Sequence, residues 1–210
     1  MVTSTSTRVR RLEADARRGE ILACAIRLFG ERPYALVSTT ELAEAAGVTR
    51  GLIHHYFGTK RGLYLEVVRA MVLVPSMDEA EIPANSPVRV RVERSADWFL
   101  DTVAQHGRTY LAVTGPEGIA GDPEVERILA TADDLAARKI LKVMGLGSNS
   151  DEHSPERAAL RAYCQLAKGV VREWLRADNL TRDQAHRLLS DTLLTIVESV
   201  LPALPALRAR

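Results

Sequence analysis

The stretch STTELAEAAGVTRGLIHHYFGTKRGL, residues 38–63, decides the predicted fold of this chain. Ser38 can cap a first short helix, and the glutamate three positions later completes the pattern of a capping box. Gly47 can end that helix, because glycine adopts a left-handed backbone at no steric cost. Thr49 can then cap a second helix, whose inward side carries Ile53 and the phenylalanine four residues further on. Two short helices joined by a tight turn form the helix-turn-helix pattern, in which the second helix lies in the major groove of DNA.

The outward side of the second helix carries groups that suit a polar partner. Arg50, Gly51, His54 and His55 all project away from its apolar side. Guanidinium and imidazole donors can bind phosphates and base edges, and a glycine allows a close backbone approach. Lys60 follows in the first turn of a third helix, beside N–H groups that form an anion site. The sequence therefore predicts contact with double-stranded DNA.

The order AxxAGVTRGLxxHYFGTKxGL, residues 43–63, resembles the DNA-binding segment of the TetR family of bacterial transcriptional regulators. The resemblance extends over residues 17–68, whereas the remainder matches only in helical layout and length. It departs at His54, where the family usually has tyrosine, and at Pro33, where it usually has glycine. Proline cannot adopt positive φ, so the exit from the preceding helix must be built differently here. The residues expected at the DNA are Ser38, Thr39, Thr49, Arg50, Gly51, His54, His55, Tyr56 and Lys60.

Composition favours an all-α protein with an uneven charge distribution. Of the 210 residues, 46% are hydrophobic, 26% charged and only 5% aromatic, and alternating β-branched runs are absent. The formal net charge is +1. Residues 1–74 nevertheless hold 11 Lys and Arg against 7 Asp and Glu, whereas residues 75–210 hold 17 against 20. The half that contains the helix-turn-helix is thus the basic one, as a DNA-binding module requires.

The sequence shows no pattern typical of a disulfide-rich, metal-binding, membrane or catalytic protein. Cys24 and Cys164 lie far apart among apolar residues, which favours neither a disulfide framework nor a metal site. No apolar signal region and no apolar run of membrane-spanning length is present, so we expect a cytoplasmic protein without membrane association. No catalytic triad, phosphate loop or metal spacing appears either, so we expect neither enzymatic activity nor a cofactor. GPEG at 115–118 and GLG at 145–147 are too short to be nucleotide loops.

The expected architecture is an N-terminal three-helix helix-turn-helix domain followed by a C-terminal helical ligand-binding and dimerisation domain, with about nine helices in all. The first domain is expected at 1–70 and the second at 71–210. Paired caps predict helix starts at Ser86-Pro87, Asp122-Pro123, Ser154-Pro155 and Thr181. The expected helices outside the central motif are 12–30, 59–75, 87–106, 107–114, 123–144, 155–177 and 182–201, the last ended by Pro202 and Pro205. Arg8, Arg10, Arg11, Arg17 and Arg18 form a basic arm, which is either a solvated tail or a DNA contact.

The last two expected helices have apolar stripes wider than one core contact needs. They form either a buried intrachain core or a two-fold four-helix interface with a second copy, and the family resemblance favours the homodimer. The residues expected at this interface are Ala162, Gln165, Gly169, Leu189, Leu193, Ile196 and Val200.

The resemblance also implies an effector pocket in the second domain. Its expected lining is Trp98, Phe99, Thr102, Val103, His106, Tyr110 and Trp174. An aromatic stripe at helical spacing is more often core than pocket, but Trp98 and Phe99 are neighbours and cannot both face one core. A mostly apolar lining predicts a largely hydrophobic small molecule.

These features favour a ligand-responsive repressor that releases a palindromic DNA operator when a small-molecule effector binds. The alternatives are an enzyme with a helix-turn-helix appendage, for which no catalytic residues appear, and a protein-binding adaptor of the same fold. An adaptor that no longer binds DNA would be expected to lack the DNA-contacting residues of the second helix of the motif, the reading helix. In this chain Arg50, Gly51 and Lys60 are all retained.

Overall fold

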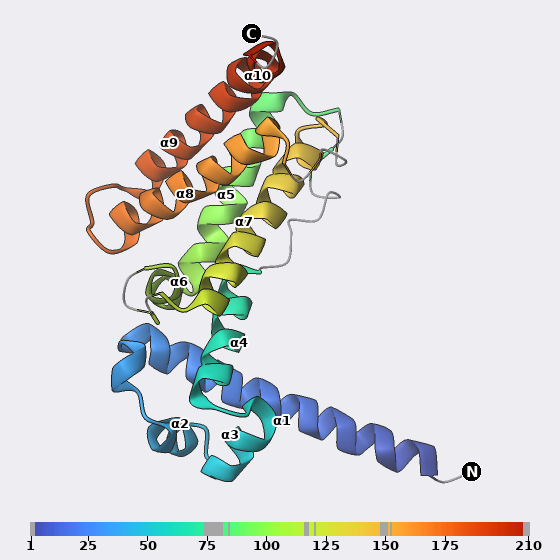
Figure 1. The fold of residues 1–210 in the computed structure, drawn as a ribbon, viewed down its shortest axis with the longest axis vertical. Coiled ribbons are helices and arrows are strands. Elements are labelled where there is room, and N and C mark those ends of the chain that lie inside the picture. Colours follow the sequence, from blue (N-terminus) through green and yellow to red (C-terminus); the bar gives the residue numbers. More distant parts are fainter. Residues whose placement is uncertain are drawn as a thin grey trace. The chain divides into compact units, whose positions relative to one another are not determined.

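The computed structural model describes residues 3–73, 82–83, 85–115, 118–119, 121–147, 151 and 153–207, and every regular element in these ranges is a helix (Figure 1). The all-α prediction is therefore confirmed. The elements are α1 (Thr3–Glu31), η1 (Tyr34–Leu36), α2 (Thr39–Ala45), α3 (Arg50–Phe57), α4 (Lys60–Val72), α5 (Val88–Gln105), α6 (Gly107–Thr114), α7 (Pro123–Val143), α8 (Pro155–Leu175), α9 (Arg182–Thr195), η3 (Ile196–Val200) and α10 (Leu201–Leu207). Among the described residues, no helix combines the length and apolar character that crossing a membrane requires.

The chain divides into two compact units that are not contiguous in sequence. The first comprises Met1–Val72 together with Arg108–Glu126, and the second comprises Leu73–Gly107 together with Arg127–Arg210. The first break lies close to the expected boundary after residue 70. The segment Arg108–Glu126, which the sequence places in the second domain, packs instead with the first unit. The expected linker at 75–86 lies largely outside the described residues.

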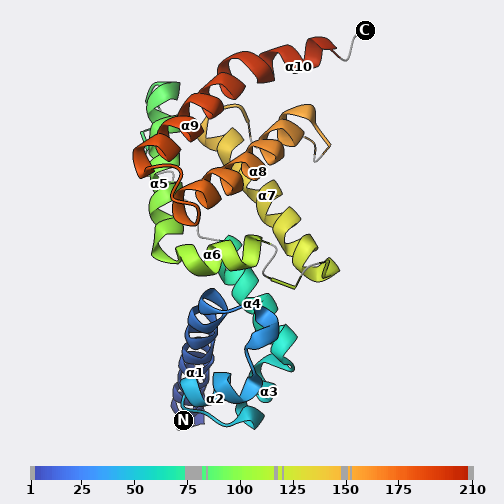
Figure 2. The ribbon, with the colours of Figure 1, turned by 90° about the vertical axis from the view of Figure 1, so that its left-hand side faces the viewer.

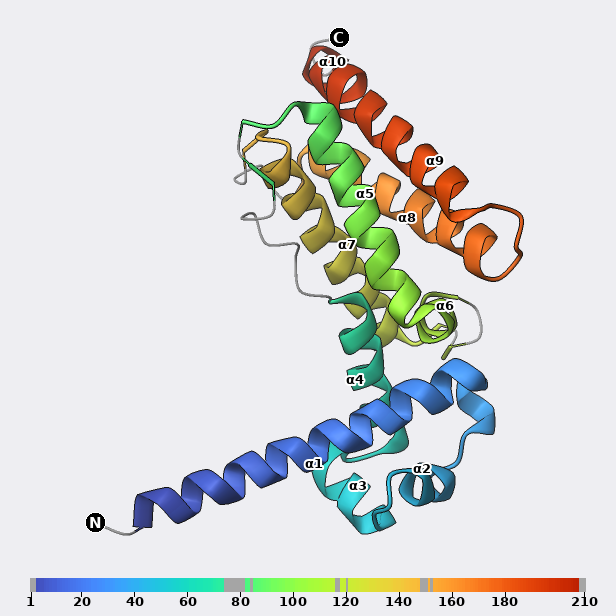
Figure 3. The same cartoon turned by 180° about the vertical axis from the view of Figure 1, so that it is seen from behind.

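The first unit is built around α1, with α2, α3 and α4 alongside it (Figure 3). Its core includes Phe29, Ile53 and Tyr64, which are 1%, 1% and 2% exposed. The Phe29 and Tyr64 rings meet edge to face with centroids 5.1 Å apart, and Tyr34 contacts both rings. Burial raises the pKa of Tyr64 to about 12. A packed aromatic cluster thus holds α4 against the end of α1.

The segment that returns to the first unit is held by close backbone packing. Gly30 lies where a Cβ atom would come within 2.3 Å of Thr109 Oγ1 and 3.1 Å of the Thr109 amide nitrogen. Thr109 is 5% exposed, and its hydroxyl donates to the Ile26 carbonyl at 2.8 Å. At Gly118, a Cβ atom would lie 2.5 Å from the Tyr64 hydroxyl. These contacts explain why Arg108–Glu126 belongs with α1 and α4.

The second unit has its own core, formed mainly by α5, α8 and α9 with the later turns of α7 (Figure 2). Leu100, Leu141, Leu160 and Leu189 are each 2% exposed or less and come from four different helices. A core shared by four amphipathic helices follows from the apolar stripes of the sequence.

The predicted helix starts are mostly confirmed. Ser154 accepts a hydrogen bond from the Arg157 amide, Asp122 accepts from the first turn of α7, and Thr181 with Gln184 forms a capping box. The start at Ser86 is wrong, since α5 begins at Val88 with Pro87 as its N-cap and no side-chain cap bond.

The prediction that Pro202 and Pro205 end the last helix is wrong. α9, η3 and α10 continue without a break from Arg182 to Leu207. Between them, η3 is a π-helical turn in which the Leu201 amide donates to the Ile196 carbonyl. A proline has no N–H to offer a helical carbonyl, and such a wide turn accommodates that loss. If α9, η3 and α10 are counted as one continuous helix, the described residues contain nine α-helices, in line with the expected number.

Candidate nucleic-acid interface

The start of α2 is fixed by a complete capping box. The Glu41 amide donates to Ser38 Oγ at 3.1 Å, and the Ser38 amide donates to Glu41 Oε2 at 2.8 Å. The Arg32 guanidinium donates to the second carboxylate oxygen at 2.8 Å. The Ser38 amide foremost, and then Arg32, lower the pKa of the Glu41 carboxyl to about 2. Ser38 itself is exposed and Thr39 is half-buried, so the α2 N-terminus is both rigid and accessible.

The turn between α2 and α3 has the geometry that the sequence predicts. Gly47 has a φ of 63°, in the left-handed region, and the Val48 amide donates to the Ala43 carbonyl at 2.9 Å. Thr49 caps α3 by accepting a hydrogen bond from the Leu52 amide at 3.2 Å. These bonds set the angle at which α3 leaves α2.

The outward face of α3 presents the predicted donors. Arg50, Gly51, His54 and His55 are exposed, Tyr56 is half-buried, and Ile53 is buried beneath them. Arg50 and His54 lie at i, i+4, so their side chains share one side of the helix. Guanidinium and imidazole donors can bind guanine acceptors or phosphate oxygens in a major groove. The residues expected at the DNA therefore lie together on one unit.

The junction between α3 and α4 is tight. Gly58 follows α3 with a φ of 73°, and Thr59 Oγ1 accepts from the Gly62 amide at 2.9 Å. A Cβ atom at Gly62 would lie 2.2 Å from the Phe57 carbonyl oxygen, so only glycine fits there. The position of α3 is consequently tied to that of α4.

Lys60 is placed differently from its predicted role. Its ammonium donates to the carbonyls of Tyr34 at 2.8 Å and Val37 at 2.6 Å, and lies 4.1 Å from the centroid of the Tyr34 ring. The sequence predicts that Lys60 binds an anion at the α4 N-terminus, whereas its ammonium binds the segment that precedes α2.

The basic arm is helical and not a disordered tail, and its contact with DNA stays a prediction. α1 begins at Thr3, so the segment from there is helical; the side chains of residues 1–12 are outside the described part. Arg17 pairs with Glu20 at 2.7 Å. Arg18 donates to Glu66 and lies 5.0 Å from the centroid of the Phe57 ring.

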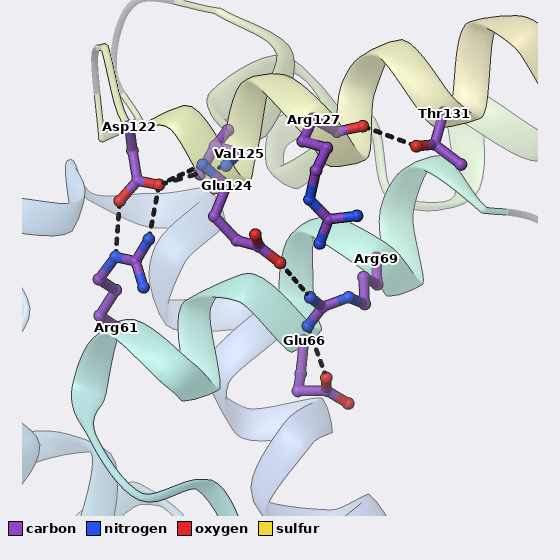
Figure 4. Close-up of polar contacts among 8 residues, drawn as sticks. All are labelled: Arg61, Glu66, Arg69, Asp122, Glu124, Val125, Arg127 and Thr131. Atoms are coloured by element: carbon purple, nitrogen blue, oxygen red, sulfur yellow. Dashed lines mark hydrogen bonds and ion pairs between the residues drawn. The ribbon is translucent and has the colours of Figure 1, made fainter.

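Two ion pairs join α4 to the start of α7 within the first unit (Figure 4). Arg61 donates to both carboxylate oxygens of Asp122, at 2.6 and 2.8 Å. Asp122 also accepts from the Glu124 amide at 2.9 Å, so one carboxylate both caps α7 and binds α4. The hydrogen bonds from Arg61 foremost lower the pKa of Asp122 to about 2. Arg69 bridges Glu124 at 2.8 Å and Glu66 at 2.9 Å.

Sequence reasoning missed these pairs. The Asp122-Pro123 dipeptide predicts a helix start and gives no sign of a basic partner 61 residues earlier. A match between charges so distant in sequence becomes visible only once the fold is known.

The residues expected in the effector pocket fall into both units. Tyr110, at 8% exposure, belongs to the first unit. The other six lie in the second unit: Trp98, Phe99, Thr102 and Trp174 are half-buried, Val103 is buried and His106 is exposed. Phe99 and Trp174 pack against the apolar core of that unit.

The expected dimer face is corrected at two positions. Leu189 and Leu193 are 1% and 2% exposed and lie in the chain's own core, because they project towards the other helices of the second unit. Ala162, Gln165 and Val200 are exposed, and Gly169 and Ile196 are half-buried. Two large apolar residues of α8 and α9 outside the expected interface set are exposed, Leu166 and Leu188, at 39% and 44% exposure.

Comparison with known proteins agrees with this geometry. The family model described as "Bacterial regulatory proteins, tetR family" matches residues 21–67. The transcriptional activator FasR of Mycolicibacterium smegmatis is 26% identical over 180 residues, which cover 83% of this chain and 80% of FasR. The transcriptional regulator BetI of Rhizobium meliloti is 27% identical over 185 residues, covering 83% and 86%. A TetR-family regulator from Streptomyces coelicolor superimposes with a TM-score of 0.64 at 24% identity, covering 89% of this chain and 83% of that one.

A capped helix-turn-helix with an exposed basic reading helix, in a chain similar to such regulators, defines a DNA-binding transcriptional regulator. Residues 21–67 match the TetR family of bacterial transcriptional regulators, and the solved TetR-family structure shares the fold of most of the chain.

Proposed function

We propose that this protein is a ligand-responsive repressor that binds a palindromic operator as a homodimer and releases it when a largely hydrophobic small molecule binds. The observation that carries the DNA-binding part is the exposed face of α3, where Arg50 and His54 stand on one side above buried Ile53. The two copies of this face would occupy successive major grooves, about 34–36 Å apart.

The homodimer is supported by the exposed apolar groups of α8, α9 and η3. Leu166, Leu188 and Val200 are 39%, 44% and 38% exposed, and the space beyond Gly169 is open in the single chain. Small and apolar groups on two neighbouring helices suit the close helix packing of a two-fold interface.

The effector proposal rests on the half-buried Trp98 and Phe99 of the second unit and on the family. An effector that favours another spacing of the reading helices opposes DNA by a coupling free energy of about 1–3 kcal/mol. DNA-binding regulators of bacteria act on chromosomal DNA, so the proposed location is the cytoplasm. The alternative is an adaptor of the same fold that does not respond to a small molecule.

The decisive experiment selects bound sequences from a random duplex library with the purified chain. The enriched operator is then titrated against wild type, Arg50→Ala and the control Arg187→Ala, an arginine on the second unit whose side chain is 85% exposed. Arg50→Ala is expected to cost roughly 1–3 kcal/mol on the operator and less on scrambled DNA, because a base contact is lost. Arg187→Ala removes the same charge and is expected to leave both affinities unchanged. An equal loss on both DNAs for Arg50→Ala would contradict base reading by this residue.

The response to a ligand is tested by a thermal-shift screen of small molecules, since a ligand that binds the native state raises stability by mass action. Hits are expected to change tryptophan fluorescence and to release operator DNA in the same concentration range. Phe99→Ala is expected to weaken the ligand without weakening ligand-free DNA binding. Ligands that stabilise the chain but leave DNA bound would favour the adaptor. A reporter gene behind the operator distinguishes repression from activation, the role that the name of FasR gives to that protein.

A further inference from the structure

We propose that Lys60 is a positioning residue for DNA binding, which holds the segment before α2 in place and does not supply a phosphate contact. This inference rests on the proposed DNA-binding function. A lysine at a helix N-terminus would otherwise be assigned to an anion, but the Lys60 side chain is bonded to the segment before α2.

The ammonium of Lys60 is already bonded within the first unit. An ammonium carries three N–H groups and no acceptor. Two of them point to the carbonyls of Tyr34 and Val37, at 2.8 and 2.6 Å, and the charge lies 4.1 Å from the centroid of the Tyr34 ring. Burial lowers the pKa of Lys60, in agreement with an ammonium partly withdrawn from water. Leaving these partners for a phosphate would break both hydrogen bonds to the Tyr34 and Val37 carbonyls.

The segment that Lys60 holds has little other support. η1 buries none of its residues, and Leu36 is 66% exposed. Its backbone is closed by one 3.0 Å bond from the Leu36 amide to Pro33 and one longer 3.4 Å bond from the Val37 amide to Tyr34. The Tyr34 ring, which packs against Phe29 and Tyr64, and the buried Val37 side chain also anchor the segment.

The carbonyls bound by Lys60 lie directly before the α2 capping box. Val37 is followed by Ser38, whose hydroxyl and amide are engaged with Glu41. Lys60 reaches this point from 23 residues further along the chain, at the first residue of α4. Because α4 also follows α3, Lys60 fixes the α2 N-terminus relative to the reading helix.

The test compares the salt dependence of DNA binding with the mobility of the held segment. A mixed-sequence 30-base-pair duplex is titrated with wild type, Lys60→Met and Tyr34→Leu between 50 and 200 mM KCl. Each phosphate contact contributes about 0.9 to the slope of log affinity against log salt. Hydrogen exchange of the DNA-free proteins then follows the amides of residues 34–42, and thermal melts establish that each variant is folded.

The proposal expects Lys60→Met to bind about tenfold more weakly with an unchanged salt slope, and to exchange faster at residues 34–42. Tyr34→Leu removes the ring and no charge, and is expected to give the same faster exchange with a smaller loss of affinity. The double variant is expected to lose less affinity than the two single losses combined, because both act on one segment. Faster exchange without loss of affinity would overturn the positioning role.

A slope lowered by about one in Lys60→Met, with exchange unchanged, would overturn the proposal and restore the phosphate contact. If Lys60→Met does not fold, Tyr34→Leu decides by the same two measurements, and unchanged exchange or affinity would overturn it. A wild-type chain that binds neither this duplex nor the selected operator would instead contradict the proposed function.

Discussion

Gly30→Ala is expected to destabilise the first unit, although alanine is the better helix former. The new methyl group would lie 2.3 Å from Thr109 Oγ1, 3.1 Å from its amide nitrogen and 3.2 Å from its Cα. Overpacking of this kind costs about 1–3 kcal/mol. Displacement of the hydroxyl also breaks its 2.8 Å bond to Ile26, worth about 1 kcal/mol. The higher helix propensity of alanine offsets about 1 kcal/mol, so the free energy of unfolding is expected to fall by roughly 2 kcal/mol.

Gly19→Ala provides the matched control on the same helix. Nothing lies within 4 Å of a Cβ atom at Gly19, so this change is expected to gain about 0.5–1 kcal/mol. Urea unfolding followed by circular dichroism gives both free energies of unfolding. Adding Thr109→Ala to Gly30→Ala removes the closest atom but not the backbone, and should restore part of the loss. Equal stabilisation by Gly30→Ala and Gly19→Ala would refute the close packing of α1 against α6.

Three further outcomes are expected. Asp122→Asn should lower the free energy of unfolding at pH 7. Because Arg61 holds the pKa of the Asp122 carboxyl near 2, this difference from wild type should vanish as the pH falls from about 4 towards 2. Urea unfolding at several pH values measures the difference, and a value independent of pH would contradict the prediction. His54→Ala should weaken binding to DNA, because the exposed imidazole on α3 can donate to phosphate oxygens or base edges, and His55→Ala is the companion control in the same titration. Gly169→Arg should convert a micromolar dimer into monomers in sedimentation, and a wild type that is itself monomeric would remove the proposed interface.

Local patterns predicted most of the secondary structure. The capping boxes at Ser38 and Thr181 and the left-handed glycine at Gly47 were all readable from the sequence, since each depends on residues a few positions apart. The exposed donors of α3 were readable for the same reason. The continuation through Pro202 was not, because it depends on a π-helical turn that the apolar pattern does not reveal.

Contacts between distant segments could not be predicted. Lys60 reads as an exposed cation from its place at a helix start, but its direction depends on a loop 23 residues earlier. Leu189 and Leu193 fit a broad apolar stripe, and only the packed structure shows which side of the stripe the chain uses for its own core.

The return of Arg108–Glu126 to the first unit sets the limits for exchanging modules between regulators. A fragment that stops at Val72 would uncover the Gly30 surface on α1. It would also leave Arg61 without its carboxylate partner. Its recognition surface would be intact in sequence but missing part of its support. A chimera that keeps the native contacts supporting the reading helix must therefore include two separate segments of this chain, the N-terminal segment and the nineteen residues from 108 to 126.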